Sequence, residues 1–126
     1  ILSYQNELFQ VILNLFSNSI DVLSSSQIEN KIIYIKIYHD ENNLYIEFLD
    51  NGGGIKDEFI NRVFEPYFTT KHKSQGTGIG LYMSLQIVTK HLNGEISVKN
   101  DTFMENNTAY FGAKFTILLP IHLQNN

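Results

Sequence analysis

The spacing of the apolar residues changes along the chain, and this change limits the folds that the chain can adopt. In residues 5–23 the residues of one helical face are spaced three or four positions apart: Leu8, Ile12, Leu15, Ser19 and Val22. In residues 33–38 and 44–49 apolar side chains alternate with other side chains, which is the period of a strand. A polar turn at 40–43 separates these two runs, so we expect an antiparallel hairpin that ends at Asp50.

The second half of the chain repeats this order of helix and strands. A second helical stripe begins at Gly80, closes at Asn93-Gly94 and contains Leu81, Leu85, Val88 and Leu92. Strands are expected at 95–99 and 110–119 because both runs suit a pleated sheet. A polar loop over 100–108 is expected between them.

These elements predict a two-layer α/β sandwich of the α+β type. In it, a mixed, mostly antiparallel sheet carries about three helices on one face. The third helix is a short helical pattern near 57–64. With 126 residues, of which 43% are hydrophobic, the chain is long enough for one domain with a core and too short for two. We therefore expect a single domain over 1–126.

The composition excludes several kinds of protein. No stretch approaches about 18 consecutive apolar residues, so no membrane span is expected. The chain has no cysteine, which excludes a disulfide framework and a thiolate metal site. The net charge of −4 argues against nucleic acid as the main partner, because binding to a phosphate backbone usually needs a clustered basic surface. The nearest such cluster, Lys71-His72-Lys73, is small and could instead serve a single polyphosphate ligand.

Residues 51–80 hold six of the eight glycines, which marks this segment as the functional region. Asp50 ends a strand and precedes three glycines, which allow positive φ and a close approach of the backbone to a ligand. The same residues also form an Asp-Asn-Gly turn readily without any ligand. At 76–80 the sequence Gly-Thr-Gly-Ile-Gly opens the second long helix, where unpaired N–H groups favour phosphates. It does not follow a strand, so it is not a dinucleotide-binding fingerprint.

Two asparagines of the first helix form a candidate cation site. Asn14 and Asn18 lie four positions apart, so their amides project from the same face of the helix. A solvated polar stripe is the commoner explanation for an asparagine on an amphipathic helix. Amide oxygens are, however, suitable ligands for Mg²⁺, which binds few protein groups together with nucleotide phosphates.

Four short motifs follow one another along the chain: Asn14-Leu15-Phe16-Ser17-Asn18, Asp50-Asn51-Gly52-Gly53-Gly54, Phe64-Glu65-Pro66-Tyr67-Phe68 and Gly76-Thr77-Gly78-Ile79-Gly80. Together they resemble the N, G1, F and G2 boxes of the histidine kinase ATP-binding domain. This domain has the Bergerat fold and belongs to the superfamily of gyrase, chaperone, kinase and MutL proteins. The resemblance covers about residues 5–120, and four ordered motifs are more specific than any one of them. It implies that the chain binds ATP or ADP together with Mg²⁺.

The resemblance also implies roles for individual residues. Asn18 is expected to be the magnesium ligand, and Asn14 and Lys71 are expected to be catalytic, holding the metal and phosphates. Asp50 is expected to accept a hydrogen bond from the adenine amino group. By the same resemblance, the F box is expected to border a mobile ATP lid at about 66–77. The other nucleotide contacts are expected at Gly52, Gly54, Ile55, Phe68, Thr70, Lys73, Gly76, Thr77, Gly78, Ile79, Gly80, Leu81 and, through a water, Thr116.

The residue at position 14 favours a kinase over a hydrolase. Members of the superfamily that hydrolyse ATP typically carry a glutamate there as general base, whereas Asn14 cannot accept a proton. A histidine kinase needs no such base, because a neutral imidazole is already a nucleophile near pH 7. We therefore expect a protein-histidine kinase catalytic domain, a transferase of two-component phosphorelay signal transduction. None of the four histidines fits the phosphoacceptor motif, so the isolated chain is expected to bind ATP without autophosphorylation.

The resemblance places the phosphate acceptor elsewhere in a longer parent protein. We expect it on the protein's own dimerisation and histidine-phosphotransfer domain, which passes phosphate to a response regulator. We expect this chain to be monomeric and cytoplasmic. Its parent protein could still be anchored in the inner membrane.

Three other interpretations compete with the kinase domain. The first is a degenerate nucleotide-binding interaction module, which the intact boxes oppose. The second is an ATPase of the same superfamily, which Asn14 opposes. The third is a structural domain in which every motif is only a turn or a core element, which four ordered matches oppose.

Overall fold

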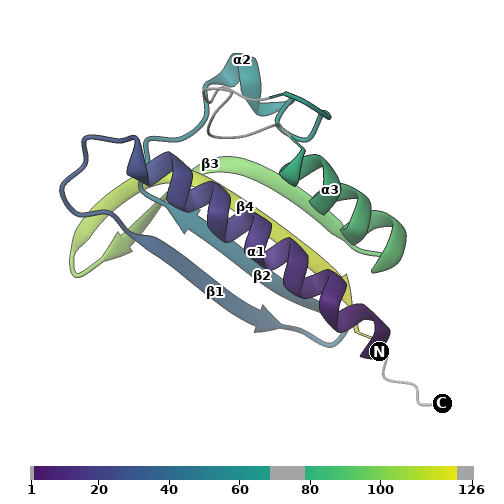
Figure 1. The fold of residues 1–126 in the computed structure, drawn as a ribbon. Helices are drawn as coiled ribbons and strands as arrows, with labels where there is room; N and C mark the ends of the chain where they lie inside the picture. Colours follow the sequence, from purple (N-terminus) through teal and green to yellow (C-terminus); the bar gives the residue numbers. More distant parts are fainter. Residues whose placement is uncertain (1, 69–78, 122–126) are drawn as a thin grey trace.

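The computed structural model describes residues 2–68 and 79–121. Within them the elements follow the order α1 (Leu2–Ser24), β1 (Ile33–His39), β2 (Asn43–Asp50), α2 (Asp57–Ile60), α3 (Gly80–Gln86), η1 (Ile87–His91), β3 (Glu95–Glu105) and β4 (Thr108–Pro120). Figure 1 shows α1 lying along the sheet, with α3 beside it. The predicted order of helix, hairpin, glycine-rich segment, helix and hairpin is confirmed.

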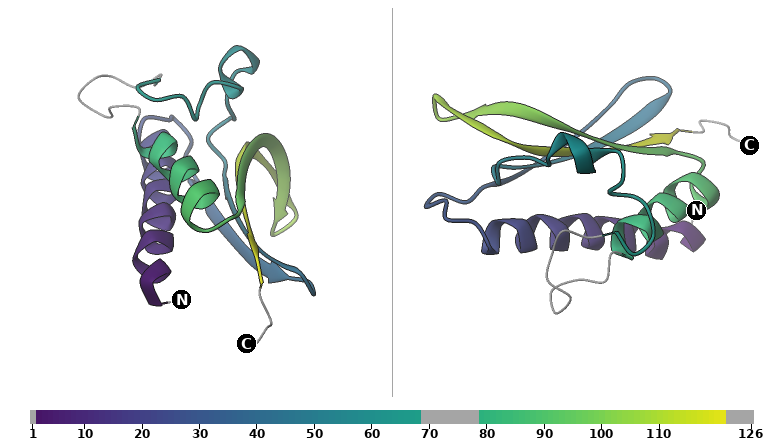
Figure 2. Two further views of the ribbon diagram at one scale, coloured as in Figure 1. Left: turned by 90° about the vertical axis from the view of Figure 1, so that its right-hand side faces the viewer. Right: turned by 90° about the horizontal axis from the view of Figure 1, so that it is seen from above.

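The described strands form one four-stranded sheet in the order β1-β2-β4-β3, and neighbouring strands are antiparallel. The right-hand view of Figure 2 shows α1 as a separate layer below these strands. The predicted two-layer sandwich is therefore confirmed. The prediction allowed a mixed, mostly antiparallel sheet, whereas every pairing among the described strands is antiparallel.

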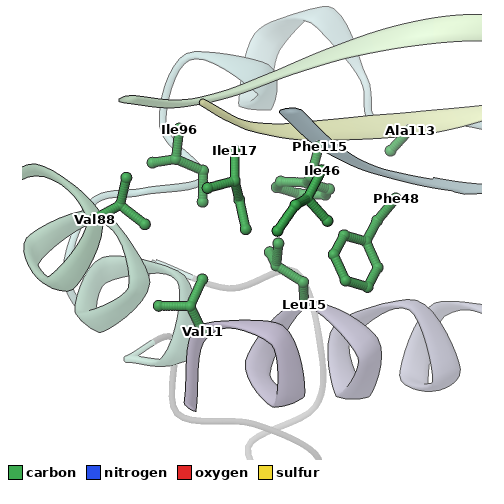
Figure 3. Close-up of a cluster of buried hydrophobic side chains, with 9 residues drawn as sticks. All are labelled: Val11, Leu15, Ile46, Phe48, Val88, Ile96, Ala113, Phe115 and Ile117. Carbon is green, nitrogen blue, oxygen red and sulfur yellow. The ribbon is translucent and has the colours of Figure 1, made fainter. Parts of the chain in front are cut away.

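A single apolar core joins the two layers. On α1, Val11 and Leu15 are four positions apart and almost fully buried, so one helical face carries them both. From the sheet, alternate residues of β2 and β4 point to the same layer, and η1 and β3 complete the cluster (Figure 3). Its members are Val11, Leu15, Ile46, Phe48, Val88, Ile96, Ala113, Phe115 and Ile117.

The hairpin of β3 and β4 is longer than the sequence predicts. Both strands continue through the polar loop predicted over 100–108. Only Asn106 and Asn107 form the turn, and their positive φ angles of 51° and 63° match a tight two-residue hairpin turn. The loop prediction is wrong because the polar residues of this stretch occupy exposed or half-buried strand positions, and Phe103 alone is buried there.

The second helix begins at Gly80 as predicted, and its last five residues form the π-helical segment η1. Asn93 takes a φ of 56°, and the N–H of Gly94 then donates to the carbonyl oxygen of Val88 at 2.8 Å. This is the predicted helix stop, because a left-handed residue and a backward hydrogen bond end a helix.

The first and third helices each differ slightly from the prediction. α1 extends the predicted 5–23 by a few residues at its start. α2 covers only the first turn of the pattern near 57–64 and is followed by turns. Within the part of the chain that the structure describes, no helix combines the length and apolar character needed to cross a membrane.

The packing of α1 predicts unequal costs for two leucines on it. Replacing the buried Leu15 by alanine should lower the free energy of unfolding by about 2–5 kcal/mol, because a cavity opens in the core. Replacing Leu13, which is 43% exposed, should cost less than about 1 kcal/mol. Urea denaturation of both variants checks this, and equal losses would contradict the predicted face of α1.

Candidate functional site

One side of α1 contacts both the loop after β2 and the start of α3. An alanine at Gly52 would bring its Cβ to 2.5 Å from Cγ1 of Val22, near the end of α1. An alanine at Gly80 would place its Cβ 4.0 Å from Cγ of Asn14, in the middle of α1. Val22 and Asn14 are eight positions apart, which is about 12 Å along a helix. Asn18 lies between them on the same side of the helix.

Asp50 is a buried carboxylate at the end of β2, only 2% exposed. Its Oδ1 accepts a hydrogen bond from the N–H of Gly52 at 2.9 Å. Burial raises the pKa of Asp50 above its ordinary value of 3.8, although the N–H groups of Gly52 and Ala113 act in the opposite direction. A carboxylate has about four acceptor positions, so Asp50 can accept a further hydrogen bond besides these two.

Gly112 allows β4 to pass close to Asp50. An alanine there would overlap the carbonyl oxygen of Asp50 and bring its Cβ to 2.8 Å from the Oδ1 atom. No side chain therefore fits at position 112, and the neighbouring N–H of Ala113 can reach the carboxylate. Gly112 was not predicted as a site residue, because its role depends on which strands are neighbours in the sheet. The isolated glycine inside a strand pattern was the available signal.

Asn100 holds the loop that follows Asp50. Its Oδ1 accepts a hydrogen bond from the N–H of Ile55, and its Nδ2 donates to the carbonyl oxygen of Ile55, both at 2.8 Å. The side chain thus pairs with a backbone unit as a neighbouring strand would. An alanine at Gly54, where φ is 82°, would lie 2.7 Å from the same Oδ1 atom. Asn100 was also missed, because it lies in the stretch predicted as a loop.

Asn51 has a structural role within the same motif. Its Oδ1 accepts from the N–H of Ile32 at 2.9 Å, and its Nδ2 donates to the carbonyl oxygen of Asn30 at 2.7 Å. The residue is 5% exposed and ties the end of β2 to the segment before β1. The turn that Asp50 and Gly52 form without a ligand is therefore present in the structure, and it shapes the loop.

Asn14 faces the start of α3 and is not part of a solvated stripe. Its Nδ2 donates to the carbonyl oxygen of Gly80 at 3.3 Å and to Oγ of Ser84 at 3.2 Å. Its Oδ1 accepts from Nε2 of Gln10 at 3.0 Å. Asn14 and Asn18 are both half-buried. These contacts join the first motif of the sequence to the helix that the fourth motif opens.

Several other predicted site residues are described. Ile55, in the loop after β2, and Leu81, in the first turn of α3, are partly buried and pack against the core cluster. Ile79 precedes α3 and is half-buried. Phe68 lies 5.6 Å from the ring of Phe59 by ring centroids and therefore packs against α2.

The structure does not bring Thr116 to these residues. Thr116 alternates along β4 with Phe115 and Ile117, which point into the core, so it lies on the opposite face of the sheet. It pairs with Glu47 and Ser97 on that face, away from the helices. The resemblance implied a water-mediated contact at Thr116, whereas its alternation with apolar neighbours along the strand indicates the opposite face.

Six predicted site residues lie outside the described residues: Thr70, Lys71, Lys73, Gly76, Thr77 and Gly78. Among the residues that are described, no group of three or more His, Cys, Asp or Glu could hold a metal ion. The amide oxygens of Asn14 and Asn18 suit a Mg²⁺ ion that also binds the phosphates of a nucleotide, because Mg²⁺ commonly binds through few protein groups.

The buried carboxylate predicts a pH-dependent stability difference. The unfolded Asp50 loses its proton near 3.8, whereas the folded residue holds it to a higher pH, so ionisation lowers the free energy of unfolding as pH rises. The Asp50→Asn variant has no carboxyl group to ionise at this position. The free energy of unfolding of the variant, relative to that of the wild type, should therefore rise as pH increases from below 3.8 to neutral. Urea denaturation across this range measures it, and a constant difference would refute the raised pKa.

Comparison with known proteins identifies relatives for this arrangement. Residues 3–123 match the family described as histidine kinase-, DNA gyrase B- and HSP90-like ATPase. A probable C4-dicarboxylate sensor kinase of Halalkalibacterium halodurans is 34% identical over 115 residues, which are 91% of this chain and 20% of that protein. Sporulation kinase A of Bacillus subtilis is 37% identical over 106 residues, which are 84% of this chain and 16% of that protein. The chain thus spans a fifth or less of the length of these two relatives.

A solved structure has the same fold. The nucleotide-free catalytic domain of histidine kinase ThkA superposes with a TM-score of 0.69 at 27% identity, covering 91% of this chain and 67% of that chain. The resemblance that the four motifs indicate is thereby confirmed. The chain belongs to the histidine kinase-, DNA gyrase B- and HSP90-like ATPase family, and its relatives are sensor histidine kinases.

Proposed function

We propose that this chain binds Mg-ATP and supplies the γ-phosphate for phosphorylation of a histidine on a separate dimerisation domain. One observation supports this above the others. A single side of α1 contacts the loop after the buried Asp50 at one end and the start of α3 at Asn14. An elongated ligand can lie along this side of α1, with its base beside Asp50 and its phosphates beside Asn14 and Asn18.

The base end is proposed at the loop after β2. The buried carboxylate of Asp50 can accept a hydrogen bond from the exocyclic amino group of adenine, which guanine lacks at the same ring position. Gly52 and Gly54 allow this loop to pack closely against Val22 and Asn100. Ile55 offers the flat base an apolar surface that Asn100 holds in place. Thr116 is left out of this end because it lies on the other face of the sheet.

The phosphate end is proposed between α1 and the start of α3. Bound Mg²⁺ would neutralise charge on the phosphates, and we assign Asn18 as its ligand. The N–H groups in the first turn of α3, at Gly80 and Leu81 after Ile79, have no acceptor within the helix and would face the phosphates. The other proposed phosphate contacts are Thr70, Lys71, Lys73, Gly76, Thr77 and Gly78.

The chemistry proposed is phosphoryl transfer to a protein rather than hydrolysis. Positions 14 to 17 carry no carboxylate that could activate a water, and the amide of Asn14 cannot act as a base. A neutral imidazole from the dimerisation domain would attack the γ-phosphate without a base from this chain. The domain then acts mainly by positioning its nucleotide, which is how much of phosphoryl transfer is catalysed.

The partners follow from this chemistry. We propose that the phosphate acceptor is the parent protein's own dimerisation and histidine-phosphotransfer domain, and that a response regulator receives the phosphate in turn. The single domain over 1–126 is proposed to be a monomeric, cytoplasmic piece of a longer protein. The two relatives, one named as a probable sensor kinase and one as a sporulation kinase, are consistent with this assignment.

Calorimetry of ATP binding, with and without Mg²⁺, tests the proposed nucleotide site. Asp50→Asn should weaken ATP and ADP binding about ten- to a hundredfold, because its amide would oppose either a backbone N–H or the adenine amino group. Asn18→Ala should weaken only the Mg²⁺-dependent part, by about tenfold or more. Retained binding in both variants would contradict the site.

Matched controls separate these losses from general damage. Asn6→Ala replaces an exposed asparagine on the same helix, and Asp57→Asn replaces an exposed aspartate, so neither should change nucleotide binding. The wild-type chain incubated with labelled ATP should carry no phosphate on its histidines. Steady release of inorganic phosphate would instead favour an ATPase, and a folded wild type that binds no nucleotide would favour a degenerate module.

A further inference from the structure

We infer that Ser84 is a positioning residue for Asn14, and that it fixes which atom of the Asn14 amide faces the phosphate end of the site. This inference rests on the proposed function for its consequence, but its geometry stands on α1 and α3 alone. Ser84 is fully buried at 0% exposure, inside the contact between these two helices. Its Oγ is 3.2 Å from Nδ2 of Asn14.

The carbonyl oxygen of Gly80 determines how the amide is turned. It lies 3.3 Å from the same amide nitrogen, and a carbonyl oxygen can only accept a hydrogen bond. The atom of Asn14 that faces α3 must therefore be the NH₂ group. Gly80 and Ser84 are four positions apart on α3, so both acceptors lie on the same helical face and can take the two N–H bonds of one amide.

In this arrangement the Asn14 side chain can offer a ligand only a hydrogen-bond acceptor. Both N–H bonds of Nδ2 are taken by α3, and Gln10 donates to Oδ1 at 3.0 Å. A carbonyl-type oxygen has two lone pairs, so one acceptor position of Oδ1 is left. An acceptor oxygen suits a cation or a water bound to it, whereas it would repel a phosphate oxygen.

Loss of Ser84 would weaken this selection. With Ser84→Ala, one N–H bond of Asn14 loses its buried acceptor, and only Gly80 opposes rotation of the amide. A rotated amide would point its NH₂ group outward, where it could bind a phosphate oxygen but not a cation. Ser84 therefore favours the orientation that supports a metal ion over the orientation that binds bare phosphate.

The ligand-free chain gives the first test, through the side-chain amide signals of Asn14 in a ¹⁵N NMR spectrum. Ser84→Ala should shift these signals and speed their exchange with solvent. Ser19→Ala, which removes another buried hydroxyl from the same helix pair, should leave them unchanged. Unchanged signals in Ser84→Ala, or equal changes in Ser19→Ala, would overturn the inference without any reference to nucleotide.

A double-mutant cycle on Mg-ATP binding gives the second test. Ser84→Ala should weaken Mg²⁺-dependent ATP binding about two- to tenfold and leave Mg²⁺-free ADP binding unchanged. In an Asn14→Ala background the same change should have no further effect, because Ser84 acts through Asn14. Ser84→Thr, which restores an oxygen acceptor, should recover part of the loss.

The two tests separate this inference from the proposed function. Additive losses in the cycle, or equal weakening of Mg²⁺-free ADP binding, would overturn the role of Ser84 while nucleotide binding itself stands. A wild-type chain that binds no Mg-ATP would refute the proposed function, and the NMR signals of Asn14 would still decide whether Ser84 holds the amide.

Discussion

The packing of α1 onto the sheet is the contact on which the rest of the structure depends. Val11 and Leu15 are buried against the sheet, which fixes the rotation of the helix about its axis. Because that rotation is fixed, Asn14 is turned toward the start of α3 and Val22 toward the loop after β2, with Asn18 between them on the helix. A hydrophobic interaction without directional preference thus positions the polar groups that chemistry would need.

Close backbone contacts fix the part of the site around Asp50 and the loop after β2. Position 112 has no room for a side chain, so β4 can lie against Asp50 and its next N–H can reach the carboxylate. Asn100 then pairs with the backbone of Ile55 and holds the loop between them. The buried carboxylate bears a desolvation cost, since burial raises its pKa, and such a cost is common where a charged group serves a ligand. This half of the site is built from strands that are far apart in the sequence.

Periodicity predicted much of the fold, and contacts between distant segments explain what it missed. The spacing of Leu8 to Val22 and the alternation of 33–38 gave the helix and the first hairpin, because both patterns report burial directly. The length of β3 and β4 was underestimated, because polar residues on an open sheet face resemble a loop. Gly112, Asn100 and Ser84 could not be assigned without knowing which strands and helices are neighbours. Thr116 was assigned to the wrong face, although its alternation with Phe115 and Ile117 carried the needed information.

A titration of the ¹⁵N-labelled chain with Mg-ADP, followed by backbone amide shifts, tests whether the nucleotide lies along α1. We expect shifts along one side of α1 from Asn14 to Val22, in the loop from Asn51 to Ile55 and at Gly80 and Leu81. We expect no shifts on the open face of the sheet around Lys36 and Thr116. Shifts centred on that open face, with the loop after Asp50 unchanged, would contradict this placement of the nucleotide.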